Sequence, residues 1–146
     1  MTVSYEIEKI NTLDNDFKKF LDAELPKLAD KFENVFNPNN AAVIEILQRA
    51  IVFICRRNGE ITGLHVSWLF ASPLDINIKI LQQQLFYVKP DSGRTAYHLF
   101  KKFIDFGKNE ANHIITMLTS HTNIKPSTLK SLGFEELQTM YRMEMR

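Results

Sequence analysis

The sequence predicts a mixed α/β (α+β) fold, a sheet flanked by helices, on the basis of three observations. Polar and apolar residues alternate over residues 3–7, which is typical of a half-buried strand. Asn58-Gly59 lies between two apolar runs and supplies the positive φ angles of a tight β-hairpin. An apolar run, a helix-period segment and a second apolar run follow over residues 78–118, which predicts a strand–helix–strand crossover with parallel strands.

The remaining elements follow from periodicity and from breaker residues. Apolar residues recur at helical spacing from Phe17 to Phe32, and Pro26 is expected to kink this helix or to begin another. The amides of residues 82–84 interrupt a strand and predict a bulge, a cleft lining or a solvent-facing edge. The further expected elements are a short helix near 42–47, strands over 51–55, 61–70 and 78–88, a helix over 95–108, a strand over 113–118, a short helix over 123–132 ended by Gly133, and a terminal strand or strand pair over 134–145.

Composition indicates one globular domain over residues 1–146. The chain is 45% hydrophobic with 11 Phe, which is enough to bury a single core. Its 18 basic and 17 acidic residues nearly cancel, so a dedicated nucleic-acid binder is disfavoured and no strong field acts on an anionic membrane. Cys55 is the single cysteine and lies in an apolar run, which predicts a buried, inert thiol in a reducing cytoplasm. Neither a signal peptide nor a membrane-spanning apolar run is expected.

The chain from Leu85 to Lys102 is the strongest candidate for a binding site. An apolar strand ends at Pro90, a short polar loop follows, and a helix then begins. The first N–H groups of a helix have no partner within it, and the helix dipole adds partial positive charge there, so this junction can hold a phosphate or pyrophosphate. Gly93 would allow close approach of a ligand to the backbone, and Arg94 is a candidate phosphate contact. The alternatives are a simple connecting turn and a solvated loop charge.

The four histidines, His65, His98, His113 and His121, show no zinc-like spacing, and no metal site is predicted. His65 or His121 is a candidate base near neutral pH, and a hydrogen-bonded structural histidine is the alternative.

Four motifs together resemble a known family: Asn58-Gly59 with Ile61–Gly63, Tyr87-Val88-x-Pro90, Gly93 with Ala96–Leu99, and Leu132-Gly133-Phe134. In order and spacing the whole chain resembles the GNAT superfamily of acetyl-CoA-dependent N-acetyltransferases, and most closely its short, divergent members encoded by tailed phages. The resemblance implies a mixed, mostly antiparallel sheet of about six or seven strands with a splayed parallel central pair, flanked by about four or five helices.

The resemblance also implies an acetyl-CoA site in the V-shaped gap between the two central parallel strands. Backbone groups of Phe86, Tyr87 and Val88 would pair with the pantetheine arm. The residues that would surround the pyrophosphate are Ser92, Gly93, Arg94, Thr95 and Ala96.

The sequence departs from the family pattern at three places. The usual R/Q-x-x-G-x-G/A loop keeps one glycine here and is shortened. Leu129 stands where a tyrosine commonly protonates the leaving thiolate, and Tyr141 is a loose substitute for it. Gln83 and Gln84 stand on the strand where many members carry a glutamate base.

Two functions are therefore expected. The first is an acetyl-CoA-dependent N-acetyltransferase acting on a primary amine of a small molecule or protein. The alternative is a non-catalytic GNAT-fold interaction module that binds a host or phage protein. A homodimer is compatible with either, and a phage origin would place the protein in the host cytoplasm.

Overall fold

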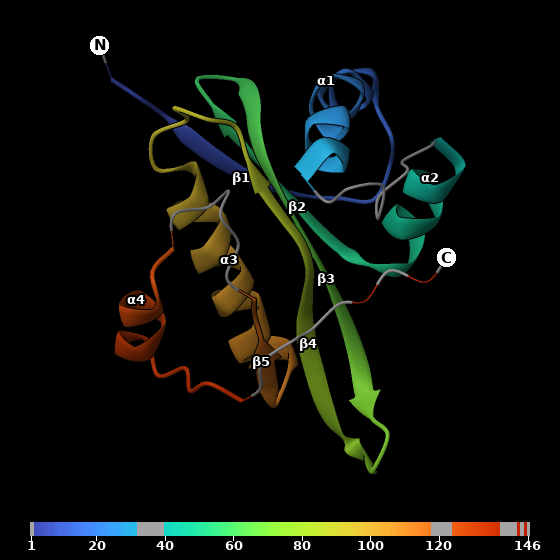
Figure 1. Cartoon of the computed structure of the whole chain (residues 1–146), viewed down its shortest axis with the longest axis vertical. Coiled ribbons are helices and arrows are strands. Elements are labelled where there is room, and N and C mark those ends of the chain that lie inside the picture. The colour runs from blue at the N-terminus through green and yellow to red at the C-terminus, as the bar shows by residue number, and fades with distance from the viewer. Residues whose placement is uncertain (1, 32–39, 118–123, 138–142, 144, 146) are drawn as a thin grey trace.

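A computed structural model describes residues 2–31, 40–117, 124–137, 143 and 145 (Figure 1). Along these residues the elements are β1 (Tyr5–Ile10), α1 (Asn15–Lys31), α2 (Asn40–Arg49), β2 (Ile51–Arg57), β3 (Glu60–Ser72), β4 (Asp75–Val88), α3 (Thr95–Glu110), β5 (His113–Ile115) and α4 (Pro126–Ser131).

The strands form one sheet in the order β1-β2-β3-β4-β5. The first three pairings are antiparallel, and β4 pairs with β5 in parallel, as the crossover predicted. In the described part of the chain the sheet has five strands, so the expectation of six or seven was wrong. The missing strand is the terminal one: residues 134–137 form no strand, and Phe134 instead packs on Phe100 of α3, with ring centroids 6.0 Å apart. Residues 138–142 of that expected strand lie outside the described residues.

The Asn-Gly hairpin is confirmed. Asn58 and Gly59 have φ angles of 52° and 85°, the left-handed conformation that this two-residue turn requires. Of the three alternatives for residues 82–84, the bulge is present, because Val66 pairs with Leu85 whereas the next residue, Ser67, pairs with Gln83. Pro26 lies inside α1 and no second helix begins there.

Helices cover both faces of the sheet, with α1 and α2 on one side and α3 and α4 on the other (Figure 1). Successive residues of a strand point to opposite faces, so Tyr87 joins the core under α1, whereas Phe86 and Val88 join the core under α3. α3 lies so close to β5 that a Cβ on Gly107 would come within 2.5 Å of the Ile114 Cδ1. Cys55 is completely buried, as expected, and burial raises the pKa of its thiol.

No helix within the described ranges combines the length and the apolar character that a membrane crossing would require.

Candidate functional site

The loop between β4 and α3 is fixed from inside the protein. The Thr95 Oγ1 donates a hydrogen bond to the Ser92 carbonyl oxygen (2.7 Å) and lies 2.8 Å from the Thr62 Oγ1 of β3. Thr62, Ser92 and Thr95 are all buried. The Thr95 hydroxyl is thus engaged with the protein itself, and this side chain holds the loop in place.

Gly93 is required by a contact within the protein. Its φ is 64°, and a Cβ at this position would collide with the hydroxyl of Tyr5. The Tyr5 Oη accepts a hydrogen bond from the N–H of Arg94 (2.9 Å), so the β1 side chain fills the space beside this glycine. The sequence suggested that Gly93 serves the approach of a ligand, but the side that lacks a Cβ faces Tyr5.

Two arginines contribute to this loop region, Arg57 from β2 and Arg94 from the residue before α3. Arg57, at the end of β2, donates from Nη1 to the carbonyl oxygen of Asp91 (3.2 Å), and its buried Nε makes no hydrogen bond within the described structure. Arg94 lies over the ring of Tyr97, with 4.4 Å from Cζ to the ring centroid. Sequence reasoning identified Arg94 but missed Arg57, whose only signal was its position just before the hairpin turn.

A groove of about 530 Å³ runs from this loop along the space between α3 and α4, and we call it the α3–α4 groove. Three of the expected pyrophosphate residues, Gly93, Arg94 and Ala96, line its upper end. Its apolar lining includes Phe100 and Ile104, and its charged lining is Lys101, Asp105 and Lys108 in addition to Arg94. The groove therefore combines the positive end of a helix with three basic side chains and an apolar wall, which suits an elongated anionic ligand with an apolar part.

The parallel pairing of β4 with β5 stops where the bulge of β4 begins. The paired residues are Ile80–Gln82 on β4 and His113–Ile115 on β5. Beyond these pairs, the side chain of Gln83 connects β4 to the two residues that follow β5. Its Nε2 donates to the Met117 carbonyl oxygen (3.1 Å), and its Oε1 accepts from the Thr116 hydroxyl (2.7 Å). From Gln83 to Val88, β4 pairs with β3 on one edge, and no strand of the described chain covers the other edge.

Of the candidate acid and base residues, only His65 lies in the described part of the protein, and it does not line this groove. His65 is fully buried between Phe86 and Phe103, with ring centroids 4.8 and 4.3 Å away. Burial lowers its pKa to about 3, an effect that the nearby Gln83 side chain opposes only in part, so at neutral pH it is an uncharged and very weak base. Tyr141 and His121 lie outside the described residues.

A buried pair that sequence reasoning missed lies on the other face of the sheet. The Tyr87 hydroxyl donates to the Glu24 Oε2 (2.5 Å), and Glu24 is only 4% exposed. Burial, and then the hydrogen bond and charge of Glu24, raise the pKa of Tyr87. The signal was a carboxylate at an apolar position of the α1 periodicity, between Leu21 and Leu28.

No family model matches the sequence, and no curated protein matches it. Solved structures do match. A ribosomal-protein-alanine N-acetyltransferase from Brucella melitensis biovar Abortus 2308 is 14% identical, with a TM-score of 0.68 over 97% of this chain and 99% of that one. The aminoglycoside N-acetyltransferase AAC(6')-Iy in complex with CoA is 17% identical, with a TM-score of 0.62 over 97% of this chain and 99% of that one. A transcriptional regulator from Bacillus halodurans C-125 is 11% identical, with a TM-score of 0.73 over 97% and 100%. The chain has the GNAT fold, and at these identities the likeness extends to the fold alone.

Proposed function

We propose that this protein is an N-acetyltransferase that moves an acetyl group from acetyl-CoA to a primary amine of a small molecule or a protein. The observation that carries the proposal is the α3–α4 groove, which begins at the N-terminus of α3 and is lined by Arg94, Lys101 and Lys108. In this assignment the first N–H groups of α3, with Arg94 and Lys101, bind the phosphates of CoA.

The edge of β4 that no described strand covers supports the second half of the assignment. Phe86 and Val88 lead directly toward the loop at the head of the groove, and within the described residues β3 pairs with only one edge of this part of β4. The pantetheine arm contains amide groups, so it can pair with the second edge much as a short strand would. Ser92 and Thr95 hold the loop in position from within, and Gly93 and Ala96 line the groove.

The chemistry in this proposal depends on positioning. The amine nitrogen attacks the thioester carbonyl carbon, the C–S bond breaks, the amine loses a proton to water, and CoA leaves as the thiol after gaining one. No titratable side chain of the described residues is assigned to these proton transfers. Alignment of the two reactants alone supplies several kcal/mol, on the order of 7–11 in the best intramolecular cases.

An interaction module is the second candidate, and one feature favours it. The β3–β4 hairpin extends beyond the helices (Figure 1), and it exposes Trp68, Leu74 and Ile76, the last two by 96% and 80%. Exposed apolar groups of this size are typical of protein contact surfaces. The phage origin, the host-cytoplasmic location and a homodimer remain predictions from the sequence.

Binding of CoA is the first test. At a concentration of about 100 times Kd, a ligand that binds only the native state adds about 2.7 kcal/mol, which raises the Tm of a chain of this size by roughly 5–10 °C. Lys101→Glu places a negative charge in the groove and should weaken CoA binding about fivefold to tenfold. Lys102→Glu is the matched control, because Lys102 is the next residue of α3 and does not line the groove. Its Nζ lies 6.0 Å from the ring centroid of Phe53 on β2.

Acetyl transfer is the second test. The protein is incubated with acetyl-CoA and a panel of amines, and products are detected by mass spectrometry together with thiol release. Formation of an acetylated product that Lys101→Glu reduces more than Lys102→Glu does supports the acetyltransferase. If CoA neither binds nor stabilises the protein, and a pull-down recovers one stoichiometric partner that is lost when Trp68 is replaced by Ser, the interaction module replaces the enzyme.

A further inference from the structure

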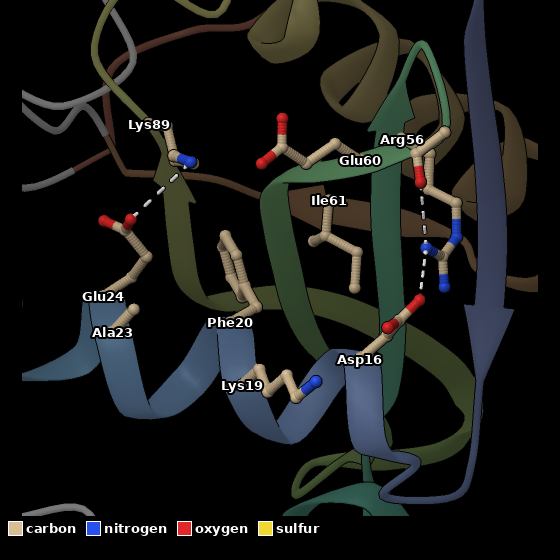
Figure 2. A pocket seen from close by; sticks show the side chains of 10 residues that line it. Asp16, Lys19, Phe20, Ala23, Glu24, Arg56, Glu60, Ile61 and Lys89 are labelled. Atoms are coloured by element: carbon tan, nitrogen blue, oxygen red, sulfur yellow. Dashed lines mark hydrogen bonds and ion pairs between the residues drawn. The ribbon is translucent and has the colours of Figure 1, made fainter.

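A second cavity, of about 340 Å³, lies between α1 and the turn that joins β2 to β3. Phe20 of α1 and Ile61 of β3 belong to the core on this face of the sheet, whereas the α3–α4 groove lies over the opposite face. The sheet therefore separates the second cavity from the α3–α4 groove. Figure 2 shows Phe20 and Ile61 between two charged ends, with Glu24 and Lys89 at one end and Arg56 and Asp16 at the other.

Glu24 presents a largely buried carboxylate whose two oxygens have different partners. Its Oε2 accepts hydrogen bonds from the Tyr87 hydroxyl (2.5 Å) and from the Lys27 Nζ (3.2 Å). Its Oε1 has the Lys89 Nζ as its ion-pair partner in the described structure, at 3.9 Å, which is too long for a hydrogen bond. An ionised carboxylate oxygen can accept more than one hydrogen bond, so this atom has the capacity to accept one from an ammonium group in the cavity.

The other charges in the wall are balanced. Arg56 is already engaged, because it pairs with Glu8 (3.1 Å) and Asp16 (3.3 Å) and also donates to the Gly59 carbonyl oxygen. Lys19 and Glu60 line the same cavity and make no ion pair within the described residues. Once Arg56 and Asp16 are set aside as a pair, the wall carries carboxylates at Glu24 and Glu60 and ammonium groups at Lys19 and Lys89, and Glu24 and Lys89 form the ion pair of 3.9 Å described above. A ligand with one charge would leave groups of its own sign facing it, whereas a zwitterion complements both.

The size and the floor of the cavity restrict the ligand further. A volume of about 340 Å³ lies near the lower end of the roughly 300–1,000 Å³ range of small-molecule sites. Phe20, Ala23 and Ile61 provide an apolar surface between the charged ends, against which a short hydrocarbon side chain can pack.

We infer that this cavity binds a small zwitterion with an apolar side chain, of the class of free α-amino acids. The ammonium group of the ligand binds the Glu24 Oε1, its carboxylate binds Lys89, and its side chain covers Phe20 and Ile61. The inference does not depend on acetyl transfer, because the site lies on the face of the sheet away from the groove.

The test uses the full chain without CoA and measures binding of L-leucine by isothermal titration calorimetry. Isoamylamine, which lacks the carboxylate, and isocaproate, which lacks the ammonium group, are the matched probes. We expect each of these to bind at least tenfold more weakly than L-leucine. Equal binding of either probe, or no binding of L-leucine, L-valine, L-methionine and L-phenylalanine at millimolar concentration, overturns the inference.

Two variants place the ligand. Glu24→Gln keeps an acceptor for the Tyr87 hydroxyl but removes the negative charge, and Lys89→Met removes the ammonium group while leaving the Glu24 pair with Tyr87 intact. We expect each to weaken L-leucine at least tenfold. Glu45→Gln is the control, since Glu45 is an exposed residue of α2 that pairs with Arg49 outside the cavity. If Glu24→Gln fails to fold, Lys89→Met decides alone, and unchanged binding in Lys89→Met refutes the site.

Discussion

His65 should make the protein sensitive to mild acid. It is fully buried against Phe86 and Phe103, and neither ring nitrogen makes a hydrogen bond with the described residues. Burial lowers the pKa of this imidazole from 6.5 to about 3. Between these values the unfolded chain binds a proton at His65 that the folded chain does not. As far as His65 is concerned, the free energy of unfolding therefore has its full value above about pH 6.5 and falls as the pH decreases toward about pH 3.

The expected size follows from the two pKa values. One pKa unit corresponds to about 1.4 kcal/mol, so between about pH 7.5 and about pH 5 the free energy of unfolding should fall by about 2 kcal/mol because of His65 alone. His65→Leu removes the titrating group and places an apolar side chain among aromatic rings. It should therefore change the stability at about pH 7.5 by no more than roughly 1–2 kcal/mol and should abolish this part of the pH dependence.

Urea unfolding of the parent and of His65→Leu at several pH values between about pH 7.5 and about pH 5 measures the difference. Carboxylates also contribute to acid sensitivity, but they are common to both proteins and cancel in the comparison. His113→Asn is the control, because His113 is exposed at the start of β5. If the parent and His65→Leu lose the same stability over this range, the argument from burial of His65 is refuted.

Three further substitutions test the packing around the site. Gly93→Ala should destabilise the protein by about 1–3 kcal/mol, because its φ of 64° is strained for alanine and the new Cβ meets the Tyr5 hydroxyl; Tyr5→Phe in the same chain should recover part of the loss, and a Gly93→Ala protein as stable as the parent would contradict this. Thr95→Val should cost about 1–3 kcal/mol in denaturant unfolding, and adding Thr62→Val should cost less than its separate effect, whereas simple additivity would show that the two hydroxyls do not interact. Gly107→Ala should lower the Tm even though alanine favours helices by about 1 kcal/mol, because the Cβ meets a β5 side chain; a higher Tm would mean that α3 can move away from the sheet.

The features that the sequence predicted well are those set by neighbouring residues. The turn at Asn58-Gly59 needs only a positive φ angle at two neighbouring positions. The helical periodicity of α3 lies within one continuous segment of the sequence. Such local signals predicted the hairpin, the crossover and the loop before α3.

The features that the sequence did not predict depend on residues far apart in the chain. The Tyr5 hydroxyl meets the N–H of Arg94 across 89 positions, and Glu24 meets Tyr87 across 63. Periodicity identifies which face of an element is buried, but it does not say which partner is found there. The reason for a glycine at position 93 and the partner of the buried carboxylate in the second cavity were therefore visible only in three dimensions.

The unequal pairing of β4 also has a consequence for how the protein opens. β4 has 14 residues and pairs with β3 from Asp75 to Val88, but its parallel pairing with β5 involves only three residues of each strand. The β2–β3–β4 meander is joined by short turns, whereas β5 is connected through the whole of α3. Amide hydrogen exchange should thus be slowest in the meander. It should be faster in β5, which can separate from β4 in a local opening that leaves the rest of the sheet intact. A molecule held along the edge of β4 that no described strand covers would slow the exchange of amides on that edge without changing the rate in β1 or β2.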